Sequence, residues 1–194
     1  MDSPGLSLTE WVVLALVAEG PTHGFAVSRL TAPDGPVGTF WQVPRPRVYR
    51  ALDRLVELSL VTPSGTEPGR GGPRRTLLAA TPSGRAAARA WLMRPVAHIR
   101  DMRTAFLVKL ALLDRAATDP APLLAAQARR LEPIVAGLRE RRERADGFEH
   151  LVASWRYETA EAALRLTRTA VSYRQEATRC SNPSARSRRS RRPA

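Results

Sequence analysis

This 194-residue chain has little cysteine, no long apolar run and no segment that resembles a signal peptide. Its single cysteine, Cys180, excludes a disulfide framework within the chain and is typical of a reducing compartment, so we expect a cytoplasmic protein. No apolar run approaches the roughly twenty residues of a membrane span, which predicts that a membrane is not a partner. Residues 1–5 lack the charged region that begins a signal peptide, and we expect none.

Groups that support catalysis or metal binding are also few. His98 and His150 stand alone, with no second metal ligand at a useful spacing. The chain has no nucleophile–base pair, no glycine loop that would cradle phosphate and no clustered metal ligands. We therefore expect no enzyme, no metal site and no cofactor.

Arginine is abundant instead. The chain has 31 basic and 18 acidic residues, which gives a net charge of +13, and Lys109 is its single lysine. Such a charge favours a polyanionic partner, and arginine forks onto phosphates and guanine edges better than lysine does. A GC-rich genome, indicated by the many alanines and prolines, is an alternative origin of the arginine excess.

The most informative stretch is a basic helix predicted from about Pro46 to Leu58. At 3.6 residues per turn, Arg47, Arg50 and Arg54 share one face. The opposite, apolar face holds Val48, Leu52 and Leu55. One side of this helix can therefore be buried while the other meets negative charge.

The elements around this helix follow the order of a winged helix-turn-helix. Before it we expect a central helix over 8–19 that opens with a Ser7–Glu10 capping box, a short helix over 25–30 and a loop over 31–39. After it we expect a strand over 60–62, a basic hairpin tip over 64–74, a returning strand over 75–80 and a helix over 81–93. This order indicates DNA as the partner.

Long helices are predicted beyond residue 94. Their apolar seams are Ile99, Met102, Phe106, Leu110 and Leu113, then Leu124, Ala128, Leu131, Val135 and Leu138, then Phe148, Leu151, Trp155, Ala162 and Leu166. Pro133 should kink or split the second helix. Such seams indicate packing within or between subunits.

The predicted fold class is mainly α with a small β-hairpin wing. Residues 6–94 form a winged helix-turn-helix DNA-binding domain and residues 95–178 a C-terminal α-helical dimerisation and effector domain. We expect residues 179–194 to form a disordered arginine-rich tail. The tail either adds a sequence-independent grip on DNA or is passive.

Four ordered blocks resemble the PadR family of bacterial transcriptional regulators. They are Leu14–Phe25, Val48–Leu55, Pro73–Arg75 and Ala80–Arg85, and a fifth block, Phe106–Leu110, resembles the subgroup with a Vir-type C-terminal helical domain. The resemblance implies a homodimer on operator DNA, a structural turn role for His23 and, as in many members, a small-molecule effector near the dimer interface. Three features depart from the family: Leu77 and Leu78 replace aromatic residues, Pro44 and Pro46 precede the basic helix, and the tail is added.

The candidate site residues follow from this outline. Arg45, Arg47 and Arg50 lie at the start of the recognition helix, where side chains reach base edges, and Tyr49 matches a family tyrosine that could contact a phosphate. Arg54 lies one turn deeper and suits an ion pair or a phosphate. The wing arginines, which would contact phosphates or a narrow minor groove, are Arg70, Arg74 and Arg75. Effector candidates are Trp91, Trp155 and Tyr157, for which a place in the packed core is the alternative.

The favoured hypothesis is a dimeric, sequence-specific transcriptional repressor. Two alternatives remain: a charge-driven nucleic-acid-binding protein without operator specificity, and a winged helix whose recognition face meets another protein. Removing a base-contacting arginine separates the first two, because it relaxes specificity only in a protein that reads sequence.

Overall fold

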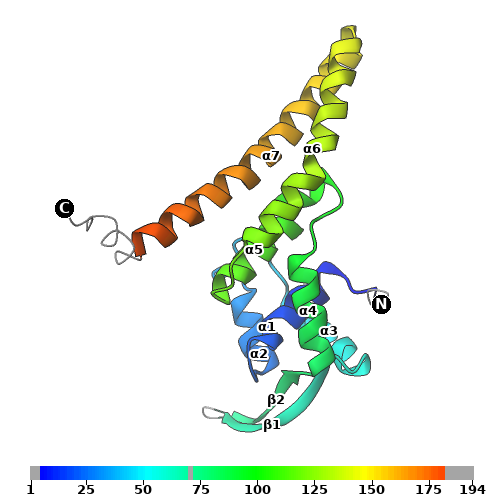
Figure 1. Ribbon diagram of the computed structural model, residues 1–194. Helices are drawn as coiled ribbons and strands as arrows, with labels where there is room; N and C mark the ends of the chain where they lie inside the picture. Colours follow the sequence, from blue (N-terminus) through cyan, green and yellow to red (C-terminus); the bar gives the residue numbers. More distant parts are fainter. Residues whose placement is uncertain (1–4, 70–71, 182–194) are drawn as a thin grey trace, which may run out of the picture. The chain divides into compact units, whose positions relative to one another are not determined.

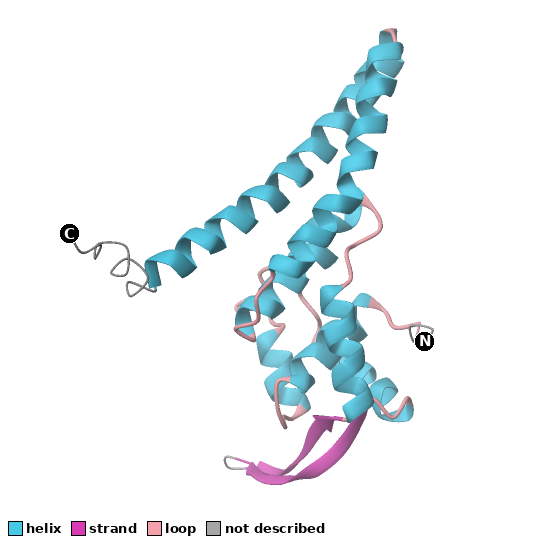
Figure 2. Ribbon diagram, viewed as in Figure 1, coloured by secondary structure: helices cyan, strands magenta, loops and turns pink. Residues whose placement is uncertain are grey.

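The computed structural model describes residues 5–69 and 72–181, and the chain divides into two compact units, Met1–Pro120 and Ala121–Ala194. Helices make up most of the chain, and the strands form one hairpin (Figures 1 and 2). The predicted fold class is therefore confirmed. The boundary near residue 94 lies inside the first unit, so the division of the chain by function stays a prediction.

The elements run in the following order. The first unit holds α1 (Leu8–Ala18), α2 (Gly24–Leu30), α3 (Arg45–Glu57), β1 (Val61–Gly69), β2 (Gly72–Ala80), α4 (Pro82–Met93), a 3-10 helix η1 (Ile99–Arg103) and α5 (Ala105–Arg115). The second unit holds α6 (Ala121–Arg144) and α7 (Gly147–Ser181). Among the described residues, no helix is both long enough and apolar enough to span a membrane.

Helix α1 forms the centre of the first unit, and its residues 11–17 are all buried. The predicted capping box starts it: the Glu10 backbone N–H donates to Ser7 Oγ at 3.3 Å, and the Ser7 N–H donates to the Glu10 carboxylate at 2.6 Å. A helix that is apolar all round must be covered on every side. It packs against α3 and α4 most extensively, and also against α2, β2 and α5.

Helices α2 and α3 form the helix-turn-helix. His23 caps α2, because its Nδ1 accepts the Ala26 backbone N–H at 3.0 Å, and the structural role implied for His23 is thereby confirmed. The loop before α3 folds back tightly, so that a Cβ at Gly38 would lie only 1.6 Å from the Ala32 carbonyl oxygen. Helix α3 then begins at Arg45, one residue before its predicted start.

The wing is longer than predicted. Strand β1 extends to Gly69 and β2 begins at Gly72, whereas the sequence pattern predicted a hairpin tip over 64–74. That assignment was wrong because the prolines of this stretch lie in a two-stranded ribbon, where each strand has a free edge that tolerates a missing N–H. The Thr22 N–H donates to the Leu78 carbonyl at 2.9 Å and the Leu78 N–H to the Thr22 carbonyl, which ties the wing to the start of α2.

Helix α4 begins as predicted. Thr81 Oγ1 accepts the Gly84 backbone N–H at 3.0 Å, and Pro82 occupies the first turn. Gly84 allows the backbones to meet closely here, since a Cβ on it would lie 2.0 Å from the Leu60 carbonyl oxygen. The first seam beyond residue 94 is divided between η1 and α5, with Met102 and Phe106 among its buried residues.

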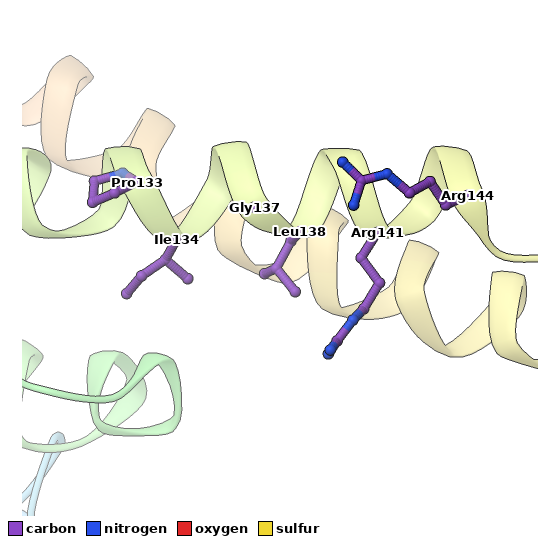
Figure 3. A pocket seen from close by; sticks show the side chains of 6 residues that line it. All are labelled: Pro133, Ile134, Gly137, Leu138, Arg141 and Arg144. Atoms are coloured by element: carbon purple, nitrogen blue, oxygen red, sulfur yellow. The ribbon is translucent and has the colours of Figure 1, made fainter.

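The second unit is a hairpin of two long helices. Helix α6 continues through Pro133 without a break (Figure 3), so the predicted split does not occur, although proline removes one backbone hydrogen bond. Gly147, with φ +49, opens α7 in a left-handed conformation that glycine adopts at no steric cost. Arg168 and Glu132, at 2.8 Å, join the two helices by an ion pair.

The third predicted seam lies on the outside of this hairpin. Along α7 the exposed apolar residues are Phe148 (78% exposed), Leu151 (63%), Trp155 (73%) and Leu166 (47%). The buried residues of the same helix are Ala153, Ala160, Leu164 and Thr167. We call the four exposed residues the α7 apolar stripe. The described residues of the hairpin leave it uncovered.

Candidate nucleic-acid interface

The recognition helix α3 has one buried and one basic face. Val48, Ala51, Leu52 and Leu55 are buried. Pro44 precedes the helix and Pro46 lies in its first turn, where the fixed φ of proline suits a helix start, so the two prolines leave the helix intact. Arg47 and Arg50 are exposed on the opposite side, as the periodicity predicted.

Arg54 forms an ion pair one turn further on. Its Nη1 donates to Glu57 Oε2 at 3.0 Å, and both side chains are more than half exposed. This contact agrees with the ion-pair interpretation of Arg54. An exposed pair of this kind adds little to stability, so Arg54 remains able to exchange Glu57 for a phosphate.

Arg45 is directed toward α2 and the second turn of α3. Its guanidinium carbon lies 5.5 Å from the centroid of the Phe25 ring and 5.6 Å from that of Tyr49. The Tyr49 ring can lie against α2 because Gly24 has no side chain: a Cβ there would be 2.9 Å from Tyr49 Cε1. Arg45 is exposed, as Arg47 is, but two aromatic rings lie beside its guanidinium group.

The wing supplies two described arginines, while Arg70 lies outside the described residues. Arg74 donates from Nε and Nη2 to Thr66 Oγ1 across the hairpin, at 3.3 and 2.9 Å. Arg75 is half-buried, with its guanidinium carbon 5.1 Å from the Phe25 ring centroid and its Nη1 3.3 Å from His23 Nε2. The start of α3 and the wing thus place cations around one aromatic ring.

These groups line an open hollow of about 600 Å³ between α2, α3 and the wing. Its lining includes Phe25, Arg45, Tyr49, Asp53, Arg74 and Arg75. Sequence reasoning named the arginines and Tyr49 but missed Phe25 and Glu67, whose carboxylate lies 2.9 Å from His23 Nε2. The aromatic residue after His23-Gly24 was the available signal for Phe25; Glu67 had none, because its role depends on strand pairing.

The three effector candidates lie in different surroundings. Trp91 is buried and stacked on Trp11, with ring centroids 5.5 Å apart, so it belongs to the core of the first unit. Trp155 is exposed in the α7 apolar stripe. Tyr157 lies under the guanidinium groups of Arg142 and Arg139, at 4.2 and 5.7 Å. Effector binding by any of them stays a prediction.

Metal ligands are not gathered anywhere in the described part of the chain, where no group of three or more His, Cys, Asp or Glu side chains could hold an ion. The chemistry that the interface offers is therefore that of guanidinium groups, aromatic faces and hydrogen-bond donors. Guanidinium groups recognise phosphate oxygens and the O6/N7 edge of guanine.

A helix-turn-helix followed by an antiparallel hairpin defines the winged helix class of DNA-binding folds. Residues 13–90 match the model of the Transcriptional regulator PadR-like family. The match covers this N-terminal segment and confirms the resemblance there. The family is one of transcriptional regulators rather than of enzymes.

Several solved structures are similar to the chain. They include Bacillus subtilis PadR in complex with operator DNA (16% identity, TM-score 0.44, covering 86% of this chain and 99% of that chain). Others are smu.1604c from Streptococcus mutans UA159 (12%, 0.39, 84% and 98%) and Bacillus subtilis PadR in complex with p-coumaric acid (14%, 0.38, 89% and 98%). No curated protein matches the chain.

Proposed function

We propose that the chain is a sequence-specific, DNA-binding transcriptional repressor that acts as a homodimer in the cytoplasm and is released by a small-molecule effector. The observation that carries the DNA-binding part is the gathering of basic side chains from α3 and β2 beside one aromatic ring, next to the exposed Arg47 and Arg50. Arg47 and Arg50 read base edges in the major groove, and the wing holds phosphates.

The homodimer is supported by the α7 apolar stripe. Large apolar side chains aligned on an exposed helix face usually mark an interaction surface in a soluble protein. A two-fold axis would bring the same stripe from a second copy against it, since such interfaces are self-complementary. Two winged helices would then face two half-sites of one operator.

The effector part of the proposal involves the helical unit. Trp155 and Tyr157 offer exposed or half-exposed aromatic faces on α7, whereas Trp91 is committed to the core. A ligand that binds one dimer arrangement better than another shifts the population toward it and changes DNA affinity accordingly. Repression follows where the operator overlaps a promoter.

The test is binding to the chain's own upstream DNA and to a shuffled duplex near 150 mM salt. We expect a preference of at least a hundredfold for the upstream DNA, retained after truncation beyond Arg179. Arg47→Ala should lower binding to the upstream DNA by ten- to a hundredfold, the value of one arginine–guanine contact, and leave the shuffled duplex little affected. Arg54→Ala on the same helix is the matched control and should keep the preference.

Equal affinity of the full chain for the two duplexes, lost on truncation, would contradict the proposal and favour the charge-driven alternative. A preference that Arg47→Ala and Arg50→Ala both leave unchanged would contradict the assignment of base reading to α3. The predicted tail lies mostly outside the described residues, and the truncated chain measures its contribution directly.

A further inference from the structure

Phe25 lies at the point where three elements of the DNA interface meet. It is the second residue of α2 and is 38% exposed. Its ring centroid is 5.5 Å from the Arg45 guanidinium carbon, on α3, and 5.1 Å from that of Arg75, on β2. A cation within about 6 Å of a ring centroid is attracted by the ring's negative face. One ring therefore attracts cations from both the recognition helix and the wing.

His23 and Glu67 fix the wing side of this cluster. His23 Nδ1 accepts the Ala26 backbone N–H, so the neutral ring carries its proton on Nε2, which donates to Glu67 Oε1 at 2.9 Å. Glu67 is also the cross-strand partner of Arg75 in the hairpin register. These contacts, with the Thr22–Leu78 bridge, hold the wing strand against the start of α2.

Two guanidinium groups beside one ring repel each other unless an anion lies between or beside them. Glu67 is a single carboxylate and is already engaged by His23. The open hollow beside Phe25 leaves room for a further anion, although Asp53 also lines its wall. DNA phosphates supply such an anion, and they are the commonest targets of arginine in protein–DNA contacts.

We propose that Phe25 is a positioning residue of the DNA interface: its ring holds Arg45 and Arg75 as one clamp for the sugar-phosphate backbone. The clamp rests on the proposed function and assigns two different roles to the arginines of the interface. Arg45, predicted from its position to read bases, instead contacts phosphate, while Arg47 and Arg50 face the bases. Stacking restricts the two side chains before DNA arrives, so less conformational freedom is lost on binding.

The test is a salt titration of DNA binding by Phe25→Leu, which removes the aromatic face and keeps an apolar side chain. We expect affinity for upstream and shuffled DNA to fall by the same factor, about tenfold at 150 mM salt. The slope of log K against log salt should become shallower by about 1 to 2, because each lost phosphate contact contributes about 0.9. Phe25→Tyr should restore both values.

Two controls separate positioning from other roles. Phe40→Leu replaces another exposed phenylalanine, on the loop before α3, and should leave affinity and salt slope unchanged. In a chain that already carries Arg45→Ala and Arg75→Ala, Phe25→Leu should have no further effect. A remaining loss in that background would show that Phe25 contacts DNA itself and would overturn the proposal.

The outcomes also distinguish this proposal from the repressor hypothesis. If Phe25→Leu binds both duplexes with wild-type affinity and salt slope, the clamp is refuted. The repressor hypothesis is unaffected by that result if the wild-type chain prefers the upstream DNA. If the wild-type chain shows no preference, operator reading fails, but the change in slope on the shuffled duplex still tests the clamp. If the melting temperature falls in both Phe25→Leu and Phe25→Tyr, the role of Phe25 is structural. That result would also overturn the proposal.

Discussion

Lys109, the single lysine of the chain, should make the stability of the first unit depend on pH. Its side chain is almost fully buried in α5, at 3% exposure. The Nζ donates to the Arg94 carbonyl oxygen at 2.6 Å and lies 4.8 Å from the centroid of the Trp91 ring. Burial, followed by the nearby charge of Arg94, lowers the pKa of Lys109 from 10.5 to about 8.

The sign of the effect follows from which state of the chain holds the proton. Below pH 8 both the folded and the unfolded chain carry the Lys109 proton, so this group adds no slope. Between pH 8 and 10.5 the unfolded chain keeps the proton that the folded chain has lost, and the free energy of unfolding rises with pH. The lowered pKa corresponds to about 3 kcal/mol at 1.36 kcal/mol per pH unit. The Trp91 ring and the Arg94 carbonyl favour the charged form, which makes this the upper end of the effect.

The assay is urea unfolding of the wild type and of Lys109→Met at pH 7 and pH 10. Methionine has a similar length and no charge, so the contributions of all other titrating groups cancel in the difference between the two proteins. We expect the wild type to gain about 2.5 kcal/mol relative to the variant between these pH values. Lys109→Arg, which stays charged throughout, should show no such gain.

A direct measurement uses the fact that the chain has one lysine. Selective ¹³Cε-lysine labelling gives a single NMR signal, and its titration midpoint should lie near pH 8 in the folded protein and near 10.5 in urea. A folded-state midpoint at 10 or above, or a wild-type-minus-variant stability difference that does not change with pH, would refute the reasoning that burial dominates at this site.

Three further predictions concern other parts of the fold. Gly84→Ala should lower the free energy of unfolding by about 3 kcal/mol or more in urea, because its Cβ would meet the Leu60 carbonyl oxygen at 2.0 Å; a loss below 1 kcal/mol would contradict this close approach. Thr81→Ala should cost about 1 kcal/mol through the lost cap of α4, whereas Thr81→Ser should keep it. Trp155→Glu should convert a dimer to a monomer in sedimentation with little change in helix content; an unchanged dimer would place the subunit interface elsewhere.

Elements with local signals were predicted closely from the sequence. The Ser7–Glu10 box and the Thr81-Pro82 pair mark helix starts through hydrogen bonds that span three residues, so nearby sequence alone determines them. The wing was predicted too short, because its outer half depends on pairing between strands, such as Glu67 with Arg75. Proline and glycine in such a ribbon look like a loop when each strand is considered alone.

In the candidate site, too, local features could be predicted from the sequence and contacts between distant residues could not. Helical periodicity was enough to predict that Arg47 and Arg50 lie opposite the buried face of α3. It could not show that Arg45 is directed to Phe25, twenty residues earlier in the chain, because that contact depends on how α2 and α3 pack. Likewise, periodicity found the α7 apolar stripe but not which seam of α7 the hairpin itself buries.

The number of arginines does not indicate their role; the position of each side chain does. A GC-rich genome would scatter arginines over the surface, and Arg54 and Arg168 fit that origin, since each is balanced by a glutamate in an exposed pair of small energetic value. Arg45 and Arg75 differ, because two cations share one aromatic ring at the junction of helix and wing. Composition does not explain that arrangement, and under the proposed function it places positive charge where the winged helix meets the DNA backbone. Under the proposed function, the charge that matters for DNA binding is therefore the local charge of the interface rather than the +13 of the whole chain.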